Sequence, residues 1–163
     1  MENLVYAIVL LPLIGFVING LFGKRLPKAL VGGLATLVVF AAFLISVSIF
    51  IGFPADGTPV IVKAFEWFTI GGIQVNFGFQ IDQLSLMMMM IVTGIGSLIH
   101  LYSIGYMSHD KGFYKFFTYL NLFIFSMLLL VMGSNYLILF IGWEGVGLCS
   151  YLLIGFWYEN TEY

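Results

Sequence analysis

Glu144 is the residue whose position in this sequence most strongly indicates chemistry. It lies near the middle of NYLILFIGWEGVGLCSYLLIGFW, residues 135–157, a run in which every other residue is uncharged. At ~1.5 Å per helical residue it would lie ~14 Å from the start of a helix, near the centre of a ~30 Å hydrocarbon layer. A carboxylate at that depth costs roughly 2.5 to 3.5 kcal/mol on insertion scales. We therefore expect its side chain to face the helix bundle or a hydrated cavity and to meet a partner there.

Proton transfer is the chemistry that this position favours. Burial and a neighbouring cation act in opposite directions on the proton affinity of a carboxyl group, so a group subject to both can exchange protons near neutral pH. The alternative is structural, a protonated glutamic acid that hydrogen-bonds to a neighbouring helix. The small residues around Glu144 favour close helix packing rather than chemistry; they are Gly142, Gly145, Gly147 and Ser150.

Three further residues are candidates for a proton path, namely Asp82, His100 and Tyr151. Asp82 opens a helical run in FQIDQLSLMMMM, where an aspartate usually caps free N–H groups, so we favour a cap over a role in proton uptake. His100 lies within two turns of the end of its expected helix, where a histidine can carry protons. A hydrogen-bonded interfacial histidine is the simpler interpretation.

The composition indicates a membrane protein. The chain is 61% hydrophobic and 9% charged, whereas about 25% of the residues of soluble domains are charged. Its net charge of -2 and six Lys and Arg residues exclude a basic surface that would bind nucleic acid. The single cysteine, Cys149, matches no metal or redox spacing and is interpreted as a packing residue. Neither a metal site nor a cofactor-binding motif is expected in this chain.

Charged residues and prolines divide the chain into apolar spans within one membrane domain, residues 1–163. We place membrane helices at about residues 4–22, 29–53, 83–105, 113–132 and 135–157. The link between the last two helices is only GSN, so these helices must be antiparallel neighbours. The sequence therefore predicts an all-α integral membrane fold of five transmembrane helices.

Residues 60–80 have a different period, which predicts a β-hairpin between the second and third helices. Apolar and polar residues alternate strictly in IQVNFGFQ, residues 73–80, as in a half-buried strand. Gly71 and Gly72 join this run to VIVKAFEWFTI and accept the positive φ angles of a two-residue turn. The hairpin should lie outside the bilayer, because a strand edge facing lipid would leave backbone polar groups unpaired. A plain amphipathic loop is the alternative.

The positions of the Lys and Arg residues predict how the chain is oriented across the membrane. With the N-terminus on one side, five cations fall on the opposite side and Lys63 alone on the first; the five are Lys24, Arg25, Lys28, Lys111 and Lys115. The positive-inside rule then places the N-terminus and the hairpin outside, and the C-terminus in the cytoplasm or matrix.

Three segments carry a family resemblance. GWEGVGLCSYLLIGFW, HLYSIGYMSHDKGFYKFFTYLNLF and FQIDQLS resemble the largest antiporter-like membrane subunit of respiratory complex I, NADH:quinone oxidoreductase chain 5 or chain L. The resemblance implies that Glu144 is a proton-channel carboxylate on the fifth helix, paired with a lysine on the seventh. It also implies that NADH, flavin, iron–sulfur clusters and quinone bind to other subunits of the complex. The expected partners are the remaining helices of the subunit, the adjacent antiporter-like subunit, other membrane subunits, and lipid. The resemblance further implies an energy-transducing membrane, either the bacterial plasma membrane or the mitochondrial inner membrane.

The chain departs from the family pattern in length. Family members contain two inverted five-helix repeats, each with a broken helix at mid-membrane, whereas this sequence resembles their N-terminal quarter, a partial antiporter-like fold. All six cations lie in turns or at expected helix ends, so none can pair with Glu144 at mid-membrane. We expect no independent catalytic activity from the chain, only a contribution to a translocating oxidoreductase. A cation/proton antiporter or membrane hydrogenase subunit, and a structural assembly module, are the alternatives.

Overall fold

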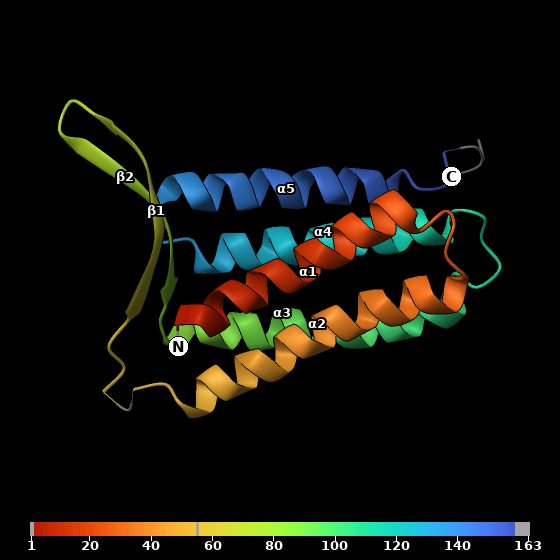
Figure 1. Ribbon diagram of the computed structural model, residues 1–163, viewed down its shortest axis with the longest axis horizontal. Coiled ribbons are helices and arrows are strands. Elements are labelled where there is room, and N and C mark those ends of the chain that lie inside the picture. The colour runs from red at the N-terminus through yellow and green to blue at the C-terminus, as the bar shows by residue number, and fades with distance from the viewer. Residues whose placement is uncertain (1, 55, 159–163) are drawn as a thin grey trace.

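Five helices and one β-hairpin make up the described residues, 2–54 and 56–158, of the computed structural model. The helices lie side by side and the hairpin lies across one end of them (Figure 1). In chain order the elements are α1 (Glu2–Phe22), α2 (Lys28–Ile51), β1 (Val60–Ile70), β2 (Ile73–Ile81), α3 (Gln83–Tyr106), α4 (Phe113–Met132) and α5 (Tyr136–Ile154). The five predicted helices and the predicted hairpin are thus confirmed.

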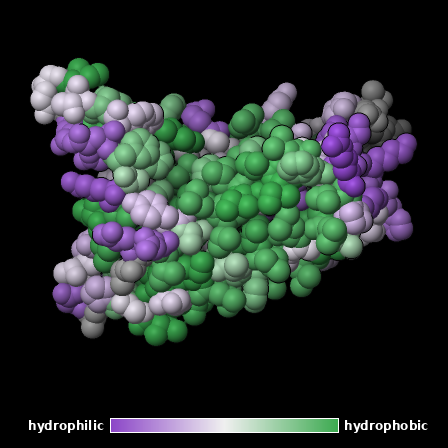
Figure 2. Space-filling model, viewed as in Figure 1, coloured by the Kyte–Doolittle hydropathy of each residue, from purple (hydrophilic) through white to green (hydrophobic). Residues whose placement is uncertain are grey.

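Each helix is long and apolar enough to cross a membrane. The shortest, α5, has 19 residues and is therefore about 28 Å long, close to the hydrocarbon thickness. Apolar residues form a continuous band along the helices, while hydrophilic residues gather at the two ends of the molecule (Figure 2). The surface thus has the pattern of a multi-pass membrane protein.

Two helices end earlier than expected, for local reasons. The second helix ends at Ile51, where Gly52 closes it with a backbone hydrogen bond to Ser48, before the proline of FPADGTP. The fifth ends at Ile154 rather than at Trp157, because Gly155 serves as its C-cap and donates to the Tyr151 carbonyl over 3.0 Å. The C-terminal residues 159–163, for which the sequence predicts a cytoplasmic or matrix location, lie outside the described residues.

The hairpin turns at Gly71 and Gly72, whose φ angles of 58° and 86° are both positive, as the predicted two-residue turn requires. Its two strands are antiparallel, with Ile70 opposite Ile73. The base of the hairpin packs on the bundle through Val62, Phe79 and Ile81, which are almost completely buried. The tip extends away from the helices (Figure 1).

The main hydrophobic core lies among α1 to α4 and the base of the hairpin. It includes Ile8 of α1, Val39 of α2, Met89 of α3 and Leu128 of α4, each fully buried. A smaller cluster around Phe113 and Phe117 closes the opposite end of the bundle. The fifth helix packs along α4 and lies at the edge of the bundle (Figure 1).

Candidate functional site

Glu144 lies near the middle of α5, about 12 Å along the helix from Tyr136. It therefore lies at the expected mid-helix depth. Glu144 is exposed in this structure rather than turned into the bundle. The reason is the position of α5 at the edge, where α4 covers one face and leaves the opposite face open.

Small residues on α5 determine which face meets α4. A Cβ atom added at Gly142 would lie 2.5 Å from the backbone nitrogen of Leu130 and 2.7 Å from its Cα, so the two helix backbones approach closely there. Gly145 faces Ser126 of α4 in the same way. Cys149 lies on this buried side as well, which confirms its prediction as a packing residue. With these residues facing α4, the side chain of Glu144 must point elsewhere.

The open face of α5 carries Glu144 together with Phe140, Gly147 and Tyr151. Spacings of four, three and four residues put these positions in one stripe along a helix. All four residues are exposed, and Tyr151 is 76% exposed. A Cβ atom added at Gly147 would meet nothing within 4 Å. Of the predicted proton-path residues, the structure therefore brings Tyr151 alone onto the face of Glu144.

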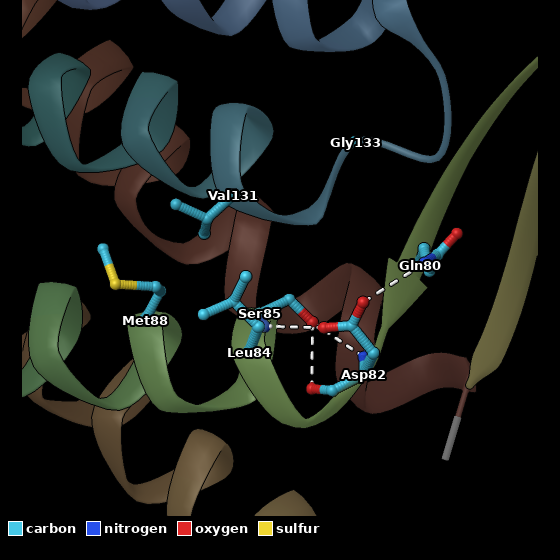
Figure 3. Close-up of a pocket in the computed structure, with 7 residues that line it drawn as sticks. All are labelled: Gln80, Asp82, Leu84, Ser85, Met88, Val131 and Gly133. Carbon is cyan, nitrogen blue, oxygen red and sulfur yellow. Dashed lines mark hydrogen bonds between the residues drawn. The ribbon is translucent and has the colours of Figure 1, made fainter. Parts of the chain in front are cut away.

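Asp82 caps α3, as the sequence predicts. Its carboxylate accepts the Ser85 backbone N–H over 2.7 Å, and its own backbone N–H donates to the Ser85 hydroxyl over 2.8 Å. Gln80 of β2 donates a further hydrogen bond to the same carboxylate (Figure 3). The Ser85 N–H holds the pKa of Asp82 below its ordinary value.

A cavity of about 240 Å³ adjoins this cap, between β2, the start of α3 and the end of α4. Gln80, Asp82, Ser85 and Gly133 line its polar side, while Met88 and Val131 contribute apolar side chains (Figure 3). Because both carboxylate oxygens of Asp82 already accept hydrogen bonds, the geometry explains this residue as a helix cap and does not join it to Glu144.

His100 is buried inside the bundle, separate from the open face of α5. Its Nδ1 lies 2.7 Å from the Gly96 carbonyl oxygen, and its Nε2 lies 3.0 Å from the side-chain oxygen of Asn121 on α4. The ring also packs against Phe117, at 6.1 Å between centroids. Asn19 of α1 is also buried. It lies one helical turn after Gly15, which the Asn121 side chain faces.

The His100–Asn121 pair can exist in two hydrogen-bonding arrangements. A carbonyl only accepts, so Nδ1 must carry a hydrogen, and in a neutral ring Nε2 must then accept. The Asn121 amide can meet that need by turning its NH₂ group toward Nε2, whereas a charged ring would require its oxygen there. The Asn121 Nδ2 atom is buried and has no hydrogen-bond partner within the described part of the chain, which leaves it available for this rotation.

Sequence reasoning did not single out Asn19 or Asn121. The signal was present, because an amide in an otherwise apolar span must find a partner inside the bundle.

Among the described residues, no group of three or more His, Cys, Asp and Glu side chains is placed to hold a metal ion.

Comparisons with known proteins show what this chain is similar to. Residues 67–117 match the family described as the N-terminus of NADH-ubiquinone oxidoreductase (complex I) chain 5. NADH-quinone oxidoreductase subunit L of Rickettsia felis is 46% identical over 99% of this chain, and subunit L of Mycobacterium tuberculosis is 48% identical over 96%. The fungal NADH-ubiquinone oxidoreductase chain 5 of Hypocrea jecorina is 40% identical over 94%. The chain spans about a quarter of the length of these relatives, 25%, 25% and 22% respectively.

Solved structures share the fold. An archaeal membrane-bound sulfane sulfur reductase superposes with a TM-score of 0.78 at 16% identity, over 93% of this chain and 30% of its own. The Mrp complex of Dietzia superposes with a TM-score of 0.73 at 26% identity, over 93% of this chain and 16% of its own. These matches confirm a partial antiporter-like fold. Over essentially its whole length, the chain is similar to the N-terminal quarter of complex I subunit L, also called chain 5.

Proposed function

We propose that this chain contributes to a proton-translocating membrane subunit of an NADH:quinone oxidoreductase, and that Glu144 transfers protons in it. The observation that carries the proposal is the carboxyl group halfway along a membrane-spanning helix. Elsewhere in the described helices, the charged residues lie within the first three positions; they are Glu2, Lys28 and Lys115. Such a costly central carboxylate is retained in membrane proteins chiefly for function.

The open face of α5 indicates where the partner of Glu144 would come from. A charged side chain facing lipid would cost roughly 2.5 to 3.5 kcal/mol, and α4 cannot reach it because it covers the other side of the helix. The chain spans a quarter of its relatives. We therefore assign this face to further helices of the same subunit or to an adjacent membrane subunit. A mid-membrane lysine on one of them would complete the proton-exchanging pair.

The redox chemistry belongs elsewhere in the proposed complex. NADH oxidation, electron transfer through flavin and iron–sulfur clusters, and quinone reduction are assigned to other subunits. The role of this chain is to hold Glu144 at mid-membrane depth, with the glycines of α5 fixing the orientation of that helix against α4. The proposed location is an energy-transducing membrane, with the N-terminus and hairpin outside and the cationic end in the cytoplasm or matrix.

A cation/proton antiporter subunit is the second candidate function. Its support is the structural similarity to the Mrp complex, at a TM-score of 0.73 and 26% identity. The two candidates differ in what drives transport. In an oxidoreductase, proton movement follows NADH oxidation, whereas an exchanger moves protons against a second cation without a redox donor.

The test uses the complete enzyme in sealed vesicles, with Glu144→Gln and Glu144→Asp variants. Proton uptake on addition of NADH should fall strongly in Glu144→Gln, because an amide neither takes up nor releases a proton in this range. Glu144→Asp should retain part of the uptake. Assembly, measured by the yield of intact complex, should be unchanged in Glu144→Gln. Normal pumping with poor assembly would instead make Glu144 a packing residue, and sodium-driven uptake without NADH would favour the antiporter.

A further inference from the structure

A cationic cavity lies at the opposite end of the bundle from the hairpin. It has a volume of about 250 Å³ and lies where α1 ends and where α2 and α4 begin. Three lysines line it, Lys24, Lys28 and Lys111, together with Phe113 and Tyr114. The cavity therefore combines three ammonium groups with an apolar and aromatic wall.

Lys28 is fixed in position at this cavity. Its ammonium donates to the Ser108 carbonyl over 2.7 Å and to the Asp110 carbonyl over 3.0 Å, and it lies 5.7 Å from the centroid of the Phe113 ring. An ammonium group has three N–H donors, and these two bonds leave one for a ligand. A cation held in this way loses little side-chain freedom when an anion binds.

Two helix N-termini add to the positive potential. Neither α2 nor α4 has a side-chain cap: the N-cap residues are Pro27 and Gly112, and neither makes a side-chain hydrogen bond to the first turn. Uncapped N-termini carry partial positive charge and free backbone N–H groups, which favour phosphate groups. The cavity is lined by residues of the first turn of both helices.

One carboxylate, that of Asp110, offsets only part of the positive charge of this cluster. Asp110 lies in the adjoining loop, where one of its oxygens accepts the Gly112 N–H over 2.6 Å and the other accepts the Trp157 indole N–H over 2.8 Å. This carboxylate therefore lies at the N-cap residue of α4 and offsets part of the positive potential there. Three lysines facing one engaged carboxylate leave the cavity with a net positive charge.

We propose that this cavity binds the phosphate group of an anionic phospholipid. The cavity lies at the ends of the helices, where lipid headgroups lie in a bilayer, and basic pockets between membrane helices bind such headgroups. Exposed apolar residues flank these lysines in the sequence: Leu21 and Phe22 precede Lys24, and Leu30 follows Lys28. They offer a surface for the acyl chains directly beside the phosphate site, which a free phosphate ion would not use.

The test measures lipid binding to the full 163-residue chain in detergent micelles by native mass spectrometry. Phosphatidylglycerol is the probe, and phosphatidylcholine and inorganic phosphate are the comparison ligands. Lys24→Gln with Lys111→Gln removes two cavity cations, whereas Lys63→Gln with Lys115→Gln removes two exposed cations outside the cavity and gives the same net charge. Both pairs are exposed in the parent chain, so the fold should be retained, which circular dichroism will check.

Phosphatidylglycerol should bind more tightly than phosphatidylcholine. The cavity pair should weaken its binding roughly thirtyfold, at about 1 kcal/mol per lysine, and the control pair should change it little. Lys24→Arg with Lys111→Arg should preserve binding. Equal losses in the two glutamine pairs, or no loss in the cavity pair, would overturn the site. Inorganic phosphate binding as tightly as the lipid would show a free-anion site and overturn the assignment to lipid.

Discussion

The packing of α5 against α4 can be tested by adding one methyl group at Gly142. A Cβ atom there would lie 2.5 Å from the Leu130 nitrogen, about 0.9 Å short of the 3.4 Å at which ordinary van der Waals contact begins. The obstacle is backbone, which cannot rotate away as the end of a side chain can. Gly142→Ala must therefore push the two helices apart or strain them, at a cost of about 1 to 3 kcal/mol.

Gly147→Ala is the matched control, because it adds the same methyl group to the open face of the same helix. Nothing lies within 4 Å of that position. Both substitutions gain the same helix propensity, about 1 kcal/mol for Gly to Ala, so this gain cancels when the two variants are compared. The difference in unfolding free energy between them should therefore equal the packing cost, about 1 to 3 kcal/mol, with Gly142→Ala the less stable.

The assay is reversible unfolding of the full chain in detergent micelles by titration with sodium dodecyl sulfate, followed by circular dichroism. Equal midpoints for Gly142→Ala and Gly147→Ala would refute the close contact between α4 and α5. That result would also remove the reason for placing Glu144 on the open face, since Gly142 is what fixes the rotation of α5.

Three further predictions concern the hairpin, the cap of α3 and the topology. Phe79→Ala should lower the free energy of unfolding by about 3 to 5 kcal/mol in the same assay, because Phe79 is only 3% exposed. Ile70 is 69% exposed, so Ile70→Ala should change this free energy by less than about 0.5 kcal/mol. Equal effects of the two substitutions would contradict the packing of the hairpin base. Asp82→Ala should cost about 1 kcal/mol. Because the Ser85 N–H lowers the folded pKa of Asp82 below 3.8, this difference should be full above pH 3.8 and shrink as the pH falls through the folded pKa, and a difference that persists in acid would argue against a charged cap. In a background without the native cysteine, an impermeant thiol reagent added outside should label Gln74→Cys and not Lys111→Cys, and labelling of Lys111→Cys would reverse the orientation.

Most of the fold is predictable from the sequence because its signals are local. Long uncharged runs predict membrane helices, a strict alternation of apolar and polar residues predicts the second strand, and paired glycines predict the turn between the strands. The structure confirms all three features, with Gly71 and Gly72 at positive φ. The early end of α5 at Gly155 was missed, because the apolar sequence continues beyond the helix to Trp157.

The direction of Glu144 could not be predicted in the same way. Depth follows from counting residues along one helix, but the face that a helix buries depends on which neighbours cover it. The residues of α5 itself are apolar on every side of the helix, so the sequence contains no amphipathic signal for the rotation of this helix. Close contacts at Gly142 and Gly145 decide it. The contact of His100 with Asn121 joins residues 21 positions apart on two helices, and it likewise depends on tertiary packing.

Infrared difference spectroscopy of the complete enzyme during turnover would test the proposed role of Glu144 most directly. A carboxyl group that takes up and releases protons changes its C=O stretching band between the resting and the energised states, and the band shifts in D₂O. We predict such a band in the parent enzyme, its loss in Glu144→Gln, and a displaced band in Glu144→Asp. An identical set of turnover-dependent carboxyl bands in the parent and in Glu144→Gln would contradict proton transfer by this residue.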